Sequence, residues 1–175
     1  NRFWNSLLDD ERGSISIEFM VVMPLLLFLT TGGIAFWDAF HSNGQTAKIA
    51  YTVSDIMSRH DFVDNTDMAY LYSVQDKMMA GDLDQRSLRI SSICFEDDQY
   101  HVLWSYSASS NDTLTPDPLQ DEQIPIEILP AMSPQDSVIL TEVEARWQPH
   151  FLNVGLGSKK WRSMLVSRPR FVHSL

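Results

Sequence analysis

The chain has 175 residues, which is room for one domain of ordinary size plus an appendage and excludes a large modular enzyme. Its 13 Lys and Arg against 23 Asp and Glu give a formal net charge of −10, and such a chain repels nucleic-acid phosphates, so no nucleic-acid partner is expected. One cysteine and five scattered histidines favour neither a disulfide nor a metal site, so we expect no metal and no organic cofactor.

Residues 15–37 form an apolar run of 23 positions with one ionisable side chain, Glu18. At about 1.5 Å per residue, a helix of this length spans the roughly 30 Å hydrocarbon core of a bilayer. We therefore predict a transmembrane helix over residues 14–37. The small residues at 33–35 would also suit a signal peptidase, but the run exceeds the roughly 7 to 15 apolar residues of a signal peptide, so we expect the segment to be retained.

Positive charge beside the span predicts its orientation. Arg2 and Arg12 precede the span, whereas no Lys or Arg follows it before Lys48. The sequence therefore predicts that residues 1–13 are a cytoplasmic segment and that residues 38–175 form a domain on the other side of the membrane.

Charge is unevenly distributed within that domain. It carries 11 Lys and Arg against 19 Asp and Glu, yet its last 17 residues hold five cations and no acid. These cations are Lys159, Lys160, Arg162, Arg168 and Arg170. They either pair with acids across a sheet, at about 0.2 to 1 kcal/mol per pair, or form a basic surface that contacts lipid headgroups or a partner.

Two amphipathic helices are expected after the span. The first extends the anchor, because apolar residues recur at steps of three and four over residues 47–57. We expect Asn43-Gly44 to interrupt this join and to bend or loosen the helix. The second covers about residues 66–79 and stops at Gly81. Nearby acids are expected to cap it rather than to bind calcium: Asp61, Asp64 and Asp67.

From residue 87 onward, runs rich in β-branched and aromatic residues predict strands. The expected strands cover residues 87–95, 100–107, 137–147 and 161–172, with a hairpin turn at 96–99. Cys94 is expected to be a core residue rather than a nucleophile. Five prolines within residues 109–134 exclude a continuous helix or a central strand, so this Pro-rich loop is predicted to lie outside the core.

Glu18 has two interpretations. An acid at the centre of a membrane-spanning helix costs about 2.5 to 3.5 kcal/mol, and less near the interface, where Glu18 is expected. It is either a carboxylate that reaches the interface or a charge used in assembly. Cleavage after Gly13 would leave a new amine on Ser14, four residues away, and the carboxylate would neutralise this amine or that of a neighbouring subunit.

This segment resembles the N-terminus of TadE-like proteins, the minor pilins or pseudopilins of the tight-adherence pilus system. In that family a charged segment ending in Arg meets a Gly, then a Glu-Phe pair, then an apolar helix with a Pro near a run of Leu. The matching positions are Arg12, Gly13, Glu18, Phe19, Pro24 and residues 25–27. The resemblance covers roughly the first 45 residues, and the family's longer members carry an adhesion domain whose motif is absent from this sequence.

The resemblance implies a non-enzymatic, single-pass protein of the bacterial inner membrane with a periplasmic domain. In some members a prepilin peptidase cleaves between the positions that match Gly13 and Ser14. Because the chain includes residues 1–13, we expect the uncut form, which stays in the inner membrane.

Two more features of the span predict contacts with other membrane subunits. Pro24 frees the carbonyl of Met20, which bends the helix or leaves a polar spot for a neighbouring chain. The small residues at 30–33, Gly32 and Gly33 among them, permit close approach of another helix; the alternative is a flexible stretch that faces lipid.

The sequence predicts an α+β fold, in which a single transmembrane helix extends into an amphipathic helix packed on an antiparallel sheet of about four strands, as in pilins. It contains no nucleophile elbow, P-loop or dinucleotide fingerprint, so an enzyme and a small-molecule substrate are not expected. The first function considered is a TadE-like pilus assembly protein that acts through protein contacts. The alternative is an accessory subunit of a larger respiratory, photosynthetic or secretion complex. The expected partners are other membrane-protein subunits and the lipid bilayer.

Overall fold

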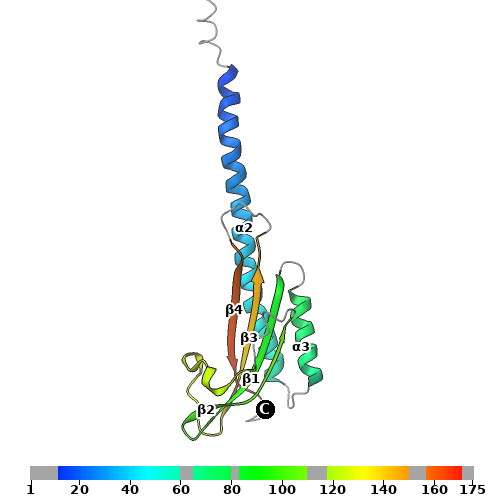
Figure 1. The fold of residues 1–175 in the computed structure, drawn as a ribbon, viewed down its shortest axis with the longest axis vertical. Coiled ribbons are helices and arrows are strands. Elements are labelled where there is room, and N and C mark those ends of the chain that lie inside the picture. Colours follow the sequence, from blue (N-terminus) through cyan, green and yellow to red (C-terminus); the bar gives the residue numbers. More distant parts are fainter. Residues whose placement is uncertain (1–11, 60–64, 80–82, 110–117, 150–156, 171–175) are drawn as a thin grey trace, which may run out of the picture.

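The computed structural model describes residues 12–59, 65–79, 83–109, 118–149 and 157–170. The helices are α2 (Arg12–Ser58) and α3 (Asn65–Met78), and two short 3₁₀ turns are η1 (Asp121–Gln123) and η2 (Ile126–Ile128). The strands are β1 (Leu83–Glu96), β2 (Gln99–Ser109), β3 (Ser137–Trp147) and β4 (Lys159–Ser167). Figure 1 shows that part of α2 packs on one four-stranded sheet while the rest projects beyond it. The expected α+β architecture is confirmed.

The helix α2 is a single α-helix of 47 residues with Pro24 inside it. The expected interruption at Asn43-Gly44 is wrong, because the helix continues through both residues. A glycine costs a helix interior about 1 kcal/mol relative to alanine. Burial on both sides of the pair outweighs this cost: Ser42 before it and Thr46 after it are both buried, and the Thr46 hydroxyl donates to the Ser42 carbonyl at 3.0 Å.

The sheet is antiparallel with the order β2-β1-β3-β4. Asp97 and Asp98 connect β1 to β2, and both have positive φ angles, 49° and 62°. Positive φ at both central residues is the geometry of a type I′ hairpin turn, whose twist matches that of the flanking strands. The predicted turn at 96–99 is therefore confirmed.

The last strand differs from its prediction at both ends. β4 begins at Lys159, two residues earlier than expected, and ends at Ser167. Pro169 has no backbone N–H to donate to a ladder, which accounts for the early end. Residues 171–172 of the predicted strand lie outside the described residues, as do Asp61, Asp64 and Gly81 near the ends of α3.

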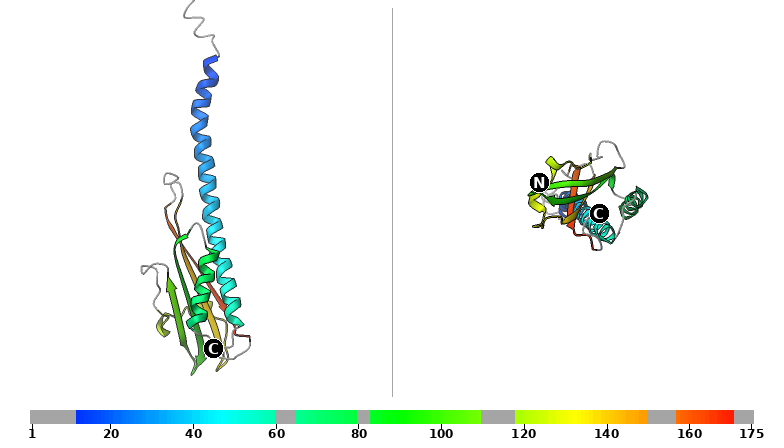
Figure 2. Two further views of the ribbon diagram at one scale, coloured as in Figure 1. Left: turned by 90° about the vertical axis from the view of Figure 1, so that its right-hand side faces the viewer. Right: turned by 90° about the horizontal axis from the view of Figure 1, so that it is seen from below.

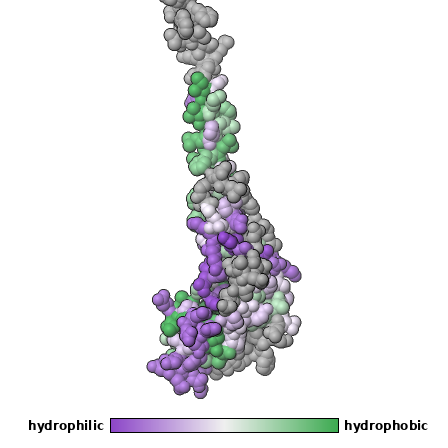
Figure 3. All heavy atoms as spheres, in the orientation of Figure 1, coloured by the Kyte–Doolittle hydropathy of each residue, from purple (hydrophilic) through white to green (hydrophobic). Residues whose placement is uncertain are grey.

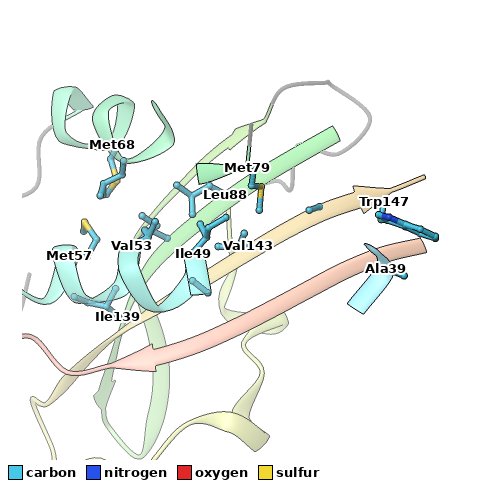
Figure 4. Close-up of a cluster of buried hydrophobic side chains, with 14 residues drawn as sticks. Ala39, Ile49, Val53, Met57, Met68, Met79, Leu88, Ile139, Val143 and Trp147 are labelled. Carbon is cyan, nitrogen blue, oxygen red and sulfur yellow. The ribbon is translucent and has the colours of Figure 1, made fainter. Parts of the chain in front are cut away.

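One face of the sheet is covered by the C-terminal part of α2 and by α3 (Figure 2). Figure 4 shows the side chains that fill the space between these layers. They include Ile49, Val53 and Met57 of α2, Met68 of α3, Leu88 of β1, Val143 and Trp147 of β3, and Met79 just after α3. The predicted apolar side of the second helix is confirmed, because Met68, Leu71 and Gln75 are all buried.

The Pro-rich loop contradicts its prediction, since its described part builds a second core cluster on the other face of the sheet. Leu119 and Ile124 are buried against Ile93, Val138 and Leu140. Prolines exclude regular structure without excluding burial, and two short 3₁₀ turns bring the apolar side chains of this segment onto the strands.

Asp121 fastens this segment to β2. One carboxylate oxygen accepts the Val102 backbone N–H at 2.7 Å, and the other lies 3.0 Å from Nδ1 of His101. The bond from Val102 and then the bond from His101 hold the pKa of Asp121 below its ordinary value. The ionised carboxylate therefore favours the docked segment.

We predict that this contribution disappears in acid. Because the folded-state pKa of Asp121 is lowered, its stabilisation is present above the unfolded value of about 3.9 and is lost as the pH falls through the folded value. Asp121→Asn should therefore be less stable than wild type at pH 6 and should approach wild type below about pH 4. Urea unfolding of the full chain in mild detergent measures this difference.

Glu122 provides the matched control, because it is an exposed carboxylate in the same 3₁₀ turn. Glu122→Gln should follow the wild-type pH profile. A constant difference between Asp121→Asn and wild type across this pH range would show that the ionised carboxylate contributes nothing to docking.

Candidate functional site

The helix α2 passes through two environments. Between residues 16 and 30 every side chain is exposed, with Ile17 at 68 %, Met20 at 75 % and Leu29 at 67 %. From Ala35 onward, positions facing the sheet are buried. Figure 3 shows apolar residues over much of the visible surface of this free part. Only 6 % of its most apolar stretch of 18 residues is buried, so it is not the core helix of a globular domain.

The sequence-predicted contact residues lie on this free part. Gly13 and Ser14 are in the first turn of α2, and Glu18, Phe19 and Pro24 are exposed farther along. Gly32 is buried, whereas Gly33 is exposed and a Cβ placed on it would meet no atom within 4 Å. Only Gly33 of the two therefore offers open space to another helix.

Helical geometry aligns several exposed residues. At about 100° per residue, Glu18, Leu25, Leu29, Gly33 and Phe36 fall within about 80° of one another, and we call these five residues the anchor strip. Of the buried positions, Asp38 lies about 140° around the helix from the nearest residue of the strip and Ser42 about 100°, whereas Ala39 lies about 40° from it. The anchor strip therefore faces away from the core of the domain, except at Phe36, which lines a pocket with Trp147 and Trp161 at the end of the sheet. Pro24 and Phe19 lie outside it.

The packed part of α2 is fastened to β3 and β4 along its length. At the end nearest the free part, Nε1 of Trp147 donates to Oδ2 of Asp38 at 2.7 Å, and both residues are buried. Figure 4 shows Trp147 beside Ala39 at this end of the core. Farther along, the Ser54 hydroxyl donates to that of Ser167 at 2.8 Å. We call the contact of Asp38 with Trp147 the junction.

The sequence did not identify the junction. Asp38 is the first acid after the apolar run, and Trp147 is the last residue of a predicted strand. An acid that follows a long apolar stretch so directly was a signal for a specific partner, although nothing in the sequence identified Trp147 as that partner.

The five C-terminal cations do not share one place. Lys160 pairs with Glu144 at 2.6 Å, and Arg162 pairs with the buried Glu142 and, at 3.3 Å, with Glu144. These two cations lie on the face of the sheet opposite the helices. Their pairing matches the prediction that the final strand binds acids across the sheet.

The remaining three cations are divided between the two ends of β4. Arg168 lies 3.7 Å from Asp136, and Arg170 lies 3.0 Å from Asp55 of α2. Lys159 stands instead 5.9 Å above the ring of Trp161, at the end of β4 near the junction.

Among the residues that the structure describes, no three His, Cys, Asp or Glu side chains are grouped so as to hold a metal ion. Cys94 is buried in β1, and this burial raises the pKa of its thiol, which disfavours the reactive thiolate.

Comparison with known proteins identifies a family over part of the chain. Residues 13–54 match the model of the family described as TadE-like protein. The sequence-based resemblance is thereby confirmed over a segment that includes the free part of α2 and most of its packed part. No curated protein and no solved structure matches the chain.

We predict that removing the junction hydrogen bond destabilises the fold. Trp147→Phe leaves the buried Asp38 carboxylate without its indole donor, and an unpaired buried group costs about 1 to 3 kcal/mol. Trp161→Phe is the matched control, since Nε1 of Trp161 has no hydrogen-bond partner among the described residues. Urea unfolding in mild detergent should show the larger loss for Trp147→Phe. Equal losses would mean that only ring volume matters.

Proposed function

We propose that this chain is a non-enzymatic, membrane-anchored component of a TadE-like pilus assembly system that acts through contacts with other pilus proteins. The observation that carries this proposal is that the segment matched by the family model nearly coincides with one helix, α2. The segment matched by the family model, residues 13–54, is almost the whole of α2, and α2 is the element that joins the free apolar surface to the core of the domain.

The free part of α2 supports anchoring in a membrane. Its exposed apolar side chains surround the helix, and such a surface is far larger than the apolar patches tolerated by soluble monomers. From Ser16 to Phe36 the helix rises about 30 Å, which equals the hydrocarbon thickness of a bilayer. Arg12, just before this stretch, favours a cytoplasmic N-terminus and therefore a periplasmic sheet domain, in the bacterial inner membrane.

The anchor strip is the proposed contact surface within the membrane. A carboxylate at Glu18 gains little from lipid, but it can pair with an amine of a neighbouring subunit at low dielectric. Gly33 lies on the same side of the helix with open space around it, which permits close approach of a second helix. Phe19 and Pro24 face other directions and would contact different neighbours. Cleavage between Gly13 and Ser14 would place a new amine one helical turn from Glu18.

The match to a pilus-related family favours this function over an accessory role in a respiratory, photosynthetic or secretion complex. No feature of the described residues points to such a complex. The two functions predict different partners, so they are separated by identifying what co-purifies with the chain in mild detergent.

We predict that changes in the anchor strip weaken assembly without unfolding the domain. Gly33→Leu fills the open space beside the helix, and Glu18→Gln removes the charge while it keeps the side-chain shape. Both variants should keep the wild-type unfolding midpoint, because the core is built from Ala35 and later residues. Both should lower the recovery of partner proteins, measured by mass spectrometry after mild detergent extraction.

Gly44→Leu is the matched control for Gly33→Leu. Gly44 is also exposed in α2 with no atom within 4 Å of an added Cβ, but it lies on the packed part beyond the junction. It should recover partners as wild type does. Wild-type recovery by Glu18→Gln and Gly33→Leu would contradict the proposed contact surface and leave α2 as a simple tether.

We also predict the topology. Protease added to intact spheroplasts should digest the sheet domain while it leaves the anchor in the membrane fraction. Protection of the domain until the spheroplasts are lysed would show the opposite orientation.

A further inference from the structure

A small apolar pocket lies where the free part of α2 meets the sheet. Its volume is about 50 Å³, and its walls come from one turn of α2 and from the adjoining ends of β3 and β4. The lining residues are Phe36, Ala39, Phe40, Trp147, Lys159 and Trp161. Trp147 is the indole of the junction, so the pocket sits directly beside that hydrogen bond.

The size of the pocket limits what can fill it. The pocket is small and partly open, so it suits part of a larger molecule better than a whole enclosed ligand. Its volume exceeds the roughly 10 to 15 Å³ that one water molecule needs, but carbon atoms line nearly all of it, so water there has few hydrogen-bond partners. A short length of hydrocarbon chain, with its remainder outside the pocket, fits both its volume and its lining.

The position of the pocket indicates where that hydrocarbon comes from. Phe36 lies at the end of the stretch that rises about 30 Å from Ser16, at the level where a bilayer core ends. Phe40 and Trp37 are 70 % and 66 % exposed on the same turn, and Trp37 stacks on His41 with ring centroids 5.1 Å apart. Aromatic side chains gather in this way at the interface between lipid and water.

Lys159 adds charge to this apolar site. Its exposed ammonium is 5.9 Å from the centre of the Trp161 ring, at the N-terminal end of β4. The neighbouring Lys160 instead pairs with Glu144 across the sheet. A cation beside an apolar pocket at the membrane surface complements a lipid, whose phosphate and acyl chains lie next to each other.

We propose that this pocket holds the upper part of one acyl chain of a phospholipid in the leaflet that faces the sheet domain, with Lys159 at the lipid phosphate. The inference rests on the proposed membrane anchoring. Bound in this way, the lipid contacts α2, β3 and β4 at once and holds the domain against the bilayer at a set height. The junction beside the pocket keeps the three elements in the arrangement that the lipid contacts.

Quenching of tryptophan fluorescence by brominated lipid tests the proposal. The full chain is placed in vesicles of phosphatidylcholine brominated at carbons 6 and 7, near the headgroup, and in matched vesicles without bromine. The emission intensity in brominated vesicles is divided by the intensity in vesicles without bromine, and this ratio removes changes in the intrinsic emission of Trp161. The contribution of Trp161 is the difference between the chain and its Trp161→Phe variant, each in a Trp37→Phe background to reduce emission from the exposed ring.

The proposal predicts strong quenching of Trp161 in these vesicles. Lys159→Gln should lose most of that quenching, whereas Lys160→Gln should keep it. Phe40→Ala should also reduce it, because it removes one wall of the pocket at an exposed position where folding does not depend on the ring. An unquenched Trp161, or equal quenching in the two lysine variants, would overturn the proposal.

An alkaline wash of the same vesicles distinguishes failure of the lipid site from failure of the membrane anchoring. A chain that stays with the vesicles while Trp161 is unquenched contradicts only the lipid site. A chain that is washed off contradicts the membrane anchoring and, with it, both proposals.

Discussion

The hydrogen bond from Trp147 to Asp38 marks the point on α2 where the helix changes its surroundings. On the C-terminal side of this bond the helix packs into the core of the domain, and on its N-terminal side the side chains of residues 16–30 are all exposed. Both partners are buried, and a hydrogen bond to a charged group contributes about 1.5 to 3 kcal/mol. Since α2 continues unbroken through this point, the direction of the anchor is set by the packing of the domain.

The sheet is used differently on its two faces. The face toward α2 and α3 is mostly apolar, as expected for a two-layer α+β domain, although Thr141 is buried on it between Ile139 and Val143. The opposite face is covered by the segment around Leu119 and Ile124 at the end far from the anchor, and nearer the anchor it carries the ion pairs of Glu142 with Arg89 and Arg162. The charges of β4 are thereby largely satisfied within the domain, which leaves Lys159 as the cation beside the apolar pocket.

The parts of the fold that depend on local pattern were predictable from the sequence. The apolar run of α2, the apolar side of α3 around Met68 and Leu71, and the hairpin at Asp97-Asp98 all follow from periodicity or turn chemistry. The errors arose where tertiary packing outweighs local preference. Burial of Thr46 and Ile49 carries the helix through Gly44, and two strands supply an apolar surface for Leu119 and Ile124 in a segment whose prolines indicated only a loop. Glu18 and Gly33 were proposed as contact residues from the sequence and stay a prediction, whereas the pairing of Asp38 with Trp147 was not predictable because the two residues are 109 positions apart.

One rigid helix joins the membrane anchor to the folded domain, and the other features of the molecule depend on this continuity. The most direct test is the distance between spin labels at positions 28 and 48, both exposed on α2 on either side of the junction and of Asn43-Gly44, in the full chain reconstituted in lipid with Cys94 replaced by serine. A continuous helix predicts a narrow distribution of label-to-label distances centred at about 30 Å, because 20 residues rise 1.5 Å each. A broad distribution, or one centred well below that distance, would show a hinge between anchor and domain and would contradict the claim.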